Sequence, residues 1–226
     1  MKSGRPSRLL ADHRASQVPD RGSITSGLSV RIALSVAVLL MGACEPTLER
    51  RVFEYERRVN SDNVQGVLEL FAENATYELR DTFVLEGKDA LRGLAEWDSV
   101  LHTRLTFHDI TTLGDSVLTN VSETNDWLSA VGVEELVHPS TLIVFQNGLI
   151  VRIDSETDTT GTNAIRRALD EVLAWAVVER PETVHRLVDE AGFRYSGENA
   201  ATWLKLLREW NAQMSSPRDG AQPDDQ

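Results

Sequence analysis

Cysteine and basic residues are both scarce in this sequence. Its 226 residues include a single cysteine and only 23 Lys and Arg against 35 Asp and Glu, which gives a formal net charge of -12. One cysteine excludes internal disulfides, CxxC redox pairs and thiolate zinc clusters. A chain with this acidic excess lacks the basic surface that binds a phosphate backbone, so we expect no nucleic-acid partner.

Uncharged apolar runs of membrane-spanning length are also missing. Ile32–Ala43 (IALSVAVLLMGA) follows a basic leader and carries no charge, but it is shorter than the roughly 20 residues that a spanning helix needs. This length is typical of the apolar core of a secretion signal. The run ends in Leu40–Cys44 (LMGAC), which resembles the bacterial lipobox, where small residues precede a cysteine that is lipidated and becomes the mature N-terminus.

We therefore predict a lipoprotein-type signal peptide over residues 1–43 and a lipid attached to Cys44. The chain would be anchored in the cell envelope, and Glu45 after the cysteine favours the outer membrane, facing the periplasm, if the cell is Gram-negative. The alternative is an ordinary signal followed by a buried core cysteine.

The mature chain alternates between two apolar periods. Helical spacing predicts helices over Glu49–Asn60, Val64–Ala72 and Lys88–Leu101. Strand-like stretches cover 75–85, 105–113, 117–128, 136–145 and 149–153, and Asn147-Gly148 between the last two predicts a tight hairpin. Three helices followed by a curved antiparallel sheet form an α+β layout in which the helices close one face of the sheet.

Four motifs within this layout resemble one family. Asn-Ser-Asp-Asn follows the first helix, Leu-Phe-Ala-Glu-Asn-Ala-Thr-Tyr ends the second, Leu-Glu-Gly-Lys-Asp-Ala-Leu-Arg opens the third, and Val-Phe-Gln-Asn-Gly-Leu-Ile-Val-Arg spans the hairpin. Over about Leu48 to Asp158 the chain is similar to the SnoaL-like branch of the nuclear transport factor 2-like superfamily. The resemblance implies a cone-shaped fold for residues 44–158, with a largely apolar pocket between helices and sheet. This scaffold hosts isomerases, cyclases, epoxide hydrolases, dehydratases and proteins without catalysis.

The resemblance also implies where the pocket residues lie. Alignment with ketosteroid isomerase, an enzyme of this superfamily, puts Tyr55 on the catalytic tyrosine, Leu79 where the carboxylate base stands and Thr141 where the oxyanion-stabilising acid stands. Because both acids are missing, that constellation is not supported. Asp81 shares the strand phase of Leu79 and would replace the base only if the strand continues in register. Tyr55 itself is either a hydrogen-bond donor or a packed core tyrosine.

A second group of candidates lies on the stretch 117–128. Glu123, Asn125 and Trp127 alternate along one face, which places them in the pocket if that face is concave and in solvent if it is convex. Glu123 is then the best surviving acid or base. His102, His108 and His138 show no metal-ligand spacing and suit surface or capping roles, so we expect no metal and no cofactor.

A helical extension follows the resemblance, over residues 159–214. Apolar stripes predict helices over 163–179 and 200–210, with a short helix between them that starts at Pro181 and stops at Gly192. About 50 residues are too few to bury three such stripes alone, so they should pack on the cone or on the outer sheet face. Cover of the outer face would block sheet-to-sheet dimers and favour a monomer. The polar residues 215–226 are predicted to be a disordered tail.

These observations favour a cell-envelope lipoprotein whose SnoaL-like domain binds a small, mostly apolar ligand without assigned catalysis. One alternative is an isomerase, cyclase or hydrolase with Glu123 or Asp81 as base and Tyr55 as donor. Another is a protein-interaction module. The sequence alone does not decide whether the chain is an enzyme.

Overall fold

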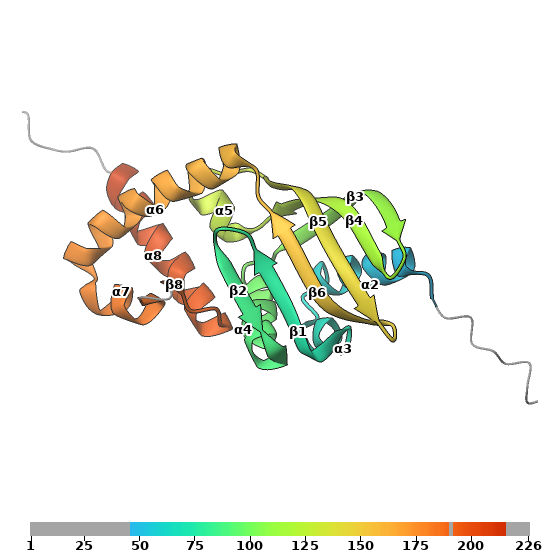
Figure 1. Ribbon diagram of the computed structural model, residues 1–226. Helices are drawn as coiled ribbons and strands as arrows, with labels where there is room; N and C mark the ends of the chain where they lie inside the picture. The colour runs from blue at the N-terminus through green and yellow to red at the C-terminus, as the bar shows by residue number, and fades with distance from the viewer. Residues whose placement is uncertain (1–45, 190–191, 216–226) are drawn as a thin grey trace, which may run out of the picture. The chain divides into compact units, whose positions relative to one another are not determined.

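The computed structural model describes residues 46–189 and 192–215 (Figure 1). The predicted signal peptide, Cys44 and residues 216–226 of the predicted tail lie outside the described residues. Ser215, which we assigned to that tail, is the last residue of a helix. All described residues fall in one compact unit, so the extension is not a separate body.

Apart from α5, β7 and β8, which were not predicted, helices and strands follow one another in the order that the apolar periods predict, with boundaries that differ by a few residues. The family-like part contains α2 (Leu48–Val59), α3 (Val64–Glu69), β1 (Phe71–Leu79), β2 (Phe83–Glu86), α4 (Gly87–Val100), β3 (Arg104–Leu113), β4 (Ser116–Thr124), α5 (Asp126–Ala130), β5 (Leu136–Gln146) and β6 (Leu149–Glu156). The extension contains α6 (Thr159–Glu179), α7 (Pro181–Leu187), β7 (Val188–Asp189), β8 (Gly192–Phe193) and α8 (Gly197–Ser215).

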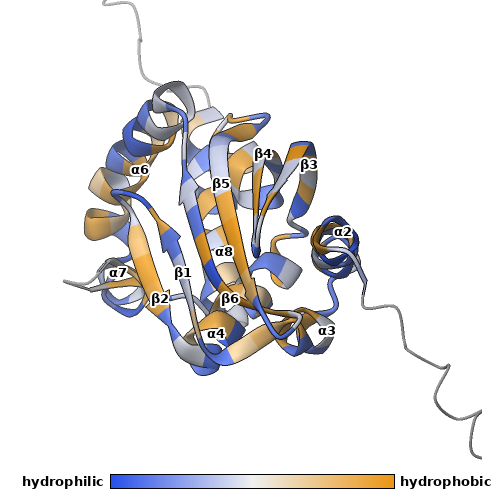
Figure 2. Ribbon diagram, turned by 45° about the vertical axis from the view of Figure 1, so that its right-hand side comes forward, coloured by the Kyte–Doolittle hydropathy of each residue, from blue (hydrophilic) through white to orange (hydrophobic). Residues whose placement is uncertain are grey.

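A six-stranded sheet runs in the order β2-β1-β6-β5-β4-β3. Strands β3 to β6 form the predicted antiparallel meander, but β1 pairs parallel to β6, so the whole sheet is mixed rather than purely antiparallel. The hydrophobic stretches of β5 and β6 lie in its middle (Figure 2). Asn147 and Gly148 both have positive φ, 52° and 74°, as the predicted hairpin requires.

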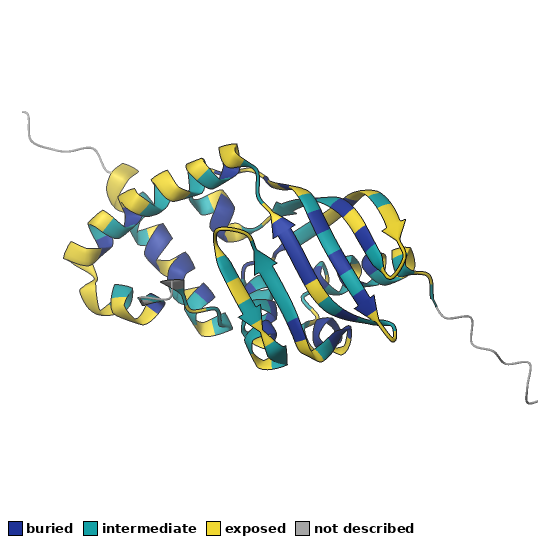
Figure 3. Cartoon of the chain, in the orientation of Figure 1, coloured by how far each residue is buried: buried dark blue, intermediate teal, exposed yellow. Residues whose placement is uncertain are grey.

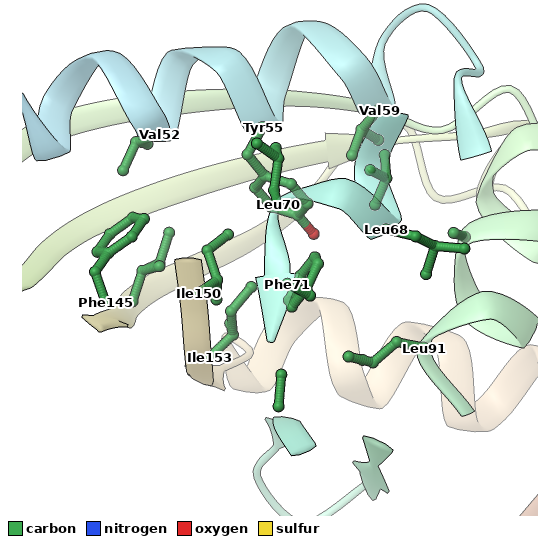
Figure 4. Packing of buried hydrophobic residues seen from close by; sticks show 14 of the residues in the cluster. Val52, Tyr55, Val59, Leu68, Leu70, Phe71, Leu91, Phe145, Ile150 and Ile153 are labelled. Carbon is green, nitrogen blue, oxygen red and sulfur yellow. The ribbon is translucent and has the colours of Figure 1, made fainter. Parts of the chain in front are cut away.

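Helices α2, α3 and α4 cover one face of this sheet and form the first core with it. From α2, Val52, Tyr55 and Val59 point toward the sheet side chains (Figure 4). The rings of Phe71 and Phe107 pack edge-on against Tyr55, with centroids 5.7 and 6.0 Å away. This is the three-turn apolar stripe that the sequence of α2 predicts.

One predicted strand is wrong in its last four residues. The stretch 117–128 leaves the sheet at Thr124, and Asn125 begins helix α5 by accepting a hydrogen bond from the Leu128 amide at 2.8 Å. An Asn side chain at such a position satisfies an amide that a helix start leaves unpaired. Glu123, Asn125 and Trp127 therefore do not share a strand face.

On the sheet face opposite the helices, a group of ion pairs lies around β6 and the end of β1. Asp154 on β6 is held by Arg80 at 2.8 Å and Arg152 at 2.7 Å, and Arg80 also reaches Glu156 at 3.1 Å. Among the described residues, no helix crosses this face in Figure 1. The same face also carries exposed apolar side chains on other strands, namely Val84 of β2, Leu118 of β4 and Val137 of β5.

The extension packs on the helical end of the cone. Helix α8 lies against α4 and α5, and its residues Trp203, Leu204 and Leu207 are buried (Figure 3). Since the extension does not take the outer sheet face as its main contact, the argument for a monomer through cover of that face does not apply. The monomer stays a prediction. Helix α7 ends at Leu187, so Gly192 is not its stop and instead belongs to β8.

Candidate functional site

A cavity of about 160 Å³ lies inside the cone, between α2, α4, the sheet and the extension. Its walls are mostly aliphatic and aromatic, with a small number of polar side chains among them. The lining residues that the argument uses are Tyr55, Tyr77, Leu79, Phe83, Leu94, Trp97, Asp98, Thr103, Glu123, Asn125, Trp127, His138, Ile165, Phe193 and Tyr195. An apolar pocket with few convergent polar groups is the usual form of a small-molecule site.

The structure brings together most of the side chains that the sequence places in a pocket. Tyr55, Leu79, Glu123, Asn125 and Trp127 all line the cavity, although the last three come from a strand end, a helix cap and a helix. Thr141 lies deeper, on a neighbouring cavity of about 20 Å³. Its hydroxyl is 2.7 Å from that of Ser155, so it is already paired.

Asp81 is not part of this site. Strand β1 ends at Leu79, and the chain turns through Asp81 with a φ of 58° before β2 begins. The side chain is exposed in that turn. The strand therefore does not continue in the register that would point Asp81 inward, and this candidate base is wrong.

Asp98 is the acidic residue that the sequence reasoning missed. It projects from α4 into the cavity, and Thr103 Oγ1 donates a hydrogen bond to its Oδ1 at 3.1 Å. Burial raises the pKa of Asp98 from the ordinary 3.8 to about 8, and the negative charge of Glu123 adds to this rise, while the Thr103 bond opposes it. At neutral pH the acid is therefore largely protonated and can donate a proton or a hydrogen bond.

A signal for Asp98 was present in the sequence. It shares the helical face of Leu91, Leu94 and Leu101, where spacing alone calls for another apolar residue. A carboxylate on such a face is either paired, protonated or functional, because an unpaired buried charge is costly. An acid within the apolar stripe of this helix therefore indicates a paired, protonated or functional group.

Glu123 is held in place from two sides. Asn125 Nδ2 donates to its Oε1 at 2.8 Å, and its Oε2 lies 3.3 Å from Nε2 of His138. His138 is 4% exposed, so the surface or capping role predicted for it is wrong. Its Nδ1 is buried and has no hydrogen-bond partner in the described part of the chain.

Three tyrosines face the same two acids. Burial raises the pKa of Tyr55, Tyr77 and Tyr195 well above the ordinary value of 10, and the charges of Asp98 and Glu123 contribute to all three shifts. These phenols therefore stay protonated and serve as neutral hydrogen-bond partners. Tyr77 and Tyr195 were not predicted, and Tyr195 comes from the extension, beyond the reach of the family resemblance.

The described residues contain no cluster of three or more His, Cys, Asp or Glu side chains arranged to hold a metal ion. None of the helices in this described part of the chain is long and apolar enough to cross a membrane.

A curved sheet closed on one face by helices around an internal cavity is the architecture of the nuclear transport factor 2-like superfamily. Residues 51–153 match the family model described as the SnoaL-like domain, so this part of the chain is a SnoaL-like domain. Its fold is the α+β cone with a C-terminal helical extension that the sequence predicts. Comparison with curated proteins finds no match.

Among solved structures, the chain is similar to SalBIII, an epoxide hydrolase/cyclase-like enzyme in pyran ring formation in polyether salinomycin. The identity is 21%, over 50% of this chain and 92% of the other, with a TM-score of 0.45. An NTF2-like protein of unknown function from Cytophaga hutchinsonii shows 15% identity over 54% and 98% of the two chains, with a TM-score of 0.44. A LEH-like epoxide hydrolase of M. tuberculosis shows 14% identity over 55% and 93%, also with a TM-score of 0.44.

Proposed function

We propose that this chain is a cell-envelope lipoprotein whose SnoaL-like domain binds a small, mostly apolar molecule in the cavity between α2, α4 and the sheet. One observation carries the binding part. The cone has not collapsed onto itself but keeps a cavity of about 160 Å³, lined by apolar side chains and a few polar ones. Protein interiors are normally packed to leave few voids larger than a water molecule, so a cavity of this size indicates a ligand site.

The polar side chains give the site an orientation. Asp98, Tyr55 and Tyr195 present hydroxyl groups that stay protonated at neutral pH, and Glu123 supplies an acceptor. A bound molecule would direct its polar group toward them and leave its apolar part against Leu79, Leu94 and the rings.

Blocking the cavity tests this function. Leu79→Trp places a large ring inside the cavity, whereas Val84→Trp places the same ring on the neighbouring strand at a residue that is 57% exposed. We expect thermal shifts with a panel of small apolar compounds for the parent and for Val84→Trp, and none for Leu79→Trp. A parent protein that responds to no compound class would contradict the proposal.

The envelope part of the proposal rests on the lipobox-like sequence before Cys44. Helix α2 begins at Leu48, only a few residues after that cysteine, so a lipid on Cys44 would hold the domain directly at the membrane surface. Two acyl chains contribute about 0.8 kcal/mol for each buried CH₂ and need no transmembrane helix.

A second candidate function is acid–base catalysis, and Asp98 is the observation that favours it. A carboxylic acid with a pKa of about 8 and a hydrogen-bonded carboxylate, Glu123, line one cavity. Two carboxyl groups in different protonation states are what an enzyme needs to protonate one atom while it deprotonates another.

Turnover separates the two functions. Epoxides and enolisable ketones are suitable probes, because protonation of an oxygen activates both. If the chain is an enzyme, Asp98→Asn should abolish product formation, as measured by mass spectrometry. The variant should still bind the probe. Binding of such probes to the parent without any product would leave the binding function and remove the catalytic one.

A further inference from the structure

Aromatic rings form a continuous series around the cavity. Each ring contacts the next, and the rings come from β1, β2, α4, α5 and the extension. The neighbouring centroids are 5.7 Å apart for Tyr77 and Phe83, 5.0 Å for Phe83 and Tyr195, 5.2 Å for Tyr195 and Trp97, 6.2 Å for Trp97 and Phe193, and 6.3 Å for Phe193 and Trp127. All six rings line the cavity, and Tyr55 adds a seventh. Only 6% of the whole chain is aromatic, so the rings are concentrated here.

The charges of the cavity wall have one sign. Asp98 and Glu123 are its acids, and no lysine or arginine of the described residues lines it. His138 also lines the wall, and its Nε2 faces Glu123. A ligand with a carboxylate or phosphate would find no lysine or arginine in this wall, and it would lie beside two acidic side chains.

The size of the cavity limits the ligand further. A cavity of about 150 Å³ holds one benzene molecule, so about 160 Å³ suits a compact molecule of roughly six to eight non-hydrogen atoms.

We propose that this cavity binds a small organic cation, a methylated ammonium group held against the aromatic rings and beside Asp98 and Glu123. The proposal rests on the ligand-binding function above and names the chemical class of its ligand. The faces of aromatic rings attract cations electrostatically, and cages of such rings recognise quaternary ammonium groups. Such a group is mostly apolar on its surface, because methyl groups cover the charge, and it therefore also suits the leucines of the wall.

The extension is part of this site. Tyr195 links the rings of Phe83 and Trp97, and Phe193 links those of Trp97 and Trp127; both residues lie outside the SnoaL-like domain of residues 51–153. Their segment approaches α4 closely at Gly93, where an added Cβ would stand 2.5 Å from the Tyr195 carbonyl oxygen. Glycine at this position therefore lets the segment approach the helix, and we assign Phe193 and Tyr195 the role of selecting the cation.

A pair of isosteric probes tests the charge directly. Choline and 3,3-dimethylbutan-1-ol have the same shape, but only choline carries a positive charge. We expect the purified full chain to bind choline at least about tenfold more tightly than the neutral alcohol in isothermal titration calorimetry. Cyclohexanol and benzene serve as neutral ring-shaped probes of the same size.

Variants connect the binding to named side chains. Tyr195→Leu removes a ring and should weaken choline at least threefold with little change for the neutral alcohol, whereas Tyr195→Phe keeps the ring and should keep the preference. Glu123→Gln should lower the preference for choline over the alcohol, because it removes a negative charge beside the bound cation. Phe53→Leu removes an exposed ring on α2 that is 46% exposed and should change neither affinity. Circular dichroism checks that each variant is folded.

The outcomes separate this inference from the function on which it rests. Equal affinity for choline and the alcohol, or binding of cyclohexanol or benzene without choline, overturns the cation but keeps the ligand-binding function. A parent protein that binds none of these probes and none of the apolar panel overturns both. A preference for choline that survives Tyr195→Leu in a folded protein overturns the role of the extension.

Discussion

Thr103 Oγ1 lies 3.1 Å from Oδ1 of Asp98 and donates a hydrogen bond to it. Thr103 is buried just after α4, and Asp98 faces the cavity from α4. The bond therefore connects a packed residue to a polar group of the site. It favours the ionised acid, against burial and the charge of Glu123, which both favour the protonated form. The balance keeps the pKa of Asp98 at about 8.

The first prediction is that Asp98 makes the fold less stable as pH rises. Because the folded pKa of about 8 exceeds the ordinary 3.8, the folded chain holds more protons than the unfolded chain between these values, and the free energy of unfolding falls across this window. One pKa unit corresponds to about 1.4 kcal/mol, so the loss between pH 5 and pH 7.5 is on the order of 3 kcal/mol. Asp98→Asn should remove it, which urea unfolding at the two pH values measures.

Thr103→Val is the control for this prediction. It keeps the volume and removes the hydrogen bond that favours the ionised acid, so the titration of Asp98 should move to still higher pH. A parent protein and an Asp98→Asn variant with parallel pH profiles would show that Asp98 titrates at its ordinary value.

The second prediction concerns the two roles of Tyr55. Its ring packs against Phe71 and Phe107, whereas its hydroxyl belongs to the cavity wall. Tyr55→Phe should leave the fold intact and cost about 1 kcal/mol of ligand affinity, the usual net value of one hydrogen bond. Tyr55→Ala should lower the free energy of unfolding by about 3–5 kcal/mol, because it leaves a large cavity in the core. Calorimetry and denaturant unfolding measure the two effects.

The third prediction is that Cys44 carries the lipid. Cys44→Ser should block lipoprotein processing and leave a precursor with its leader, visible as a larger species by mass spectrometry. Met41→Leu, which brings the sequence closer to the usual lipobox, should be processed normally. Cleavage of Cys44→Ser at the parent position, with unchanged membrane association, would contradict the anchor.

The sequence predicts the fold better than the site, for a physical reason. Periodic apolar residues fix which elements form, and Asn147-Gly148 fixes one turn, because each is a local property of the chain. The parallel pairing of β1 with β6 is long-range and leaves no local pattern. Asn125 could have been recognised as a helix cap, which would have ended the strand over 117–128 at the correct place.

The site combines groups that no single motif joins. Asp98 comes from α4, Glu123 from β4, His138 from β5 and Tyr195 from the extension, so their proximity depends on the tertiary structure. Tyr55 and Leu79 line the cavity, which is where the family resemblance places them. Asp81 failed because its strand ends two residues too early.

The last prediction is that the extension is a permanent part of the domain. Trp203 on α8 is 0% exposed and packs against Trp127 and Phe193, with ring centroids 6.4 and 5.2 Å away. Trp203→Ala should lower the free energy of unfolding by about 3–5 kcal/mol. Trp210→Ala, on the same helix at a half-buried position, should cost less. Urea unfolding measures both changes.

Deletion of residues 162–226 extends the same argument. It would expose Trp97 of α4, Leu101 directly after α4, and Trp127 and Leu128 of α5, which are all buried in the cluster that α8 completes. A contiguous apolar surface of this kind promotes association, so the shortened chain should aggregate or melt at a much lower temperature. Because Phe193 and Tyr195 are removed as well, any folded remainder should also lose its preference for choline. A soluble, equally stable shortened chain would mean that the SnoaL-like domain folds without its extension.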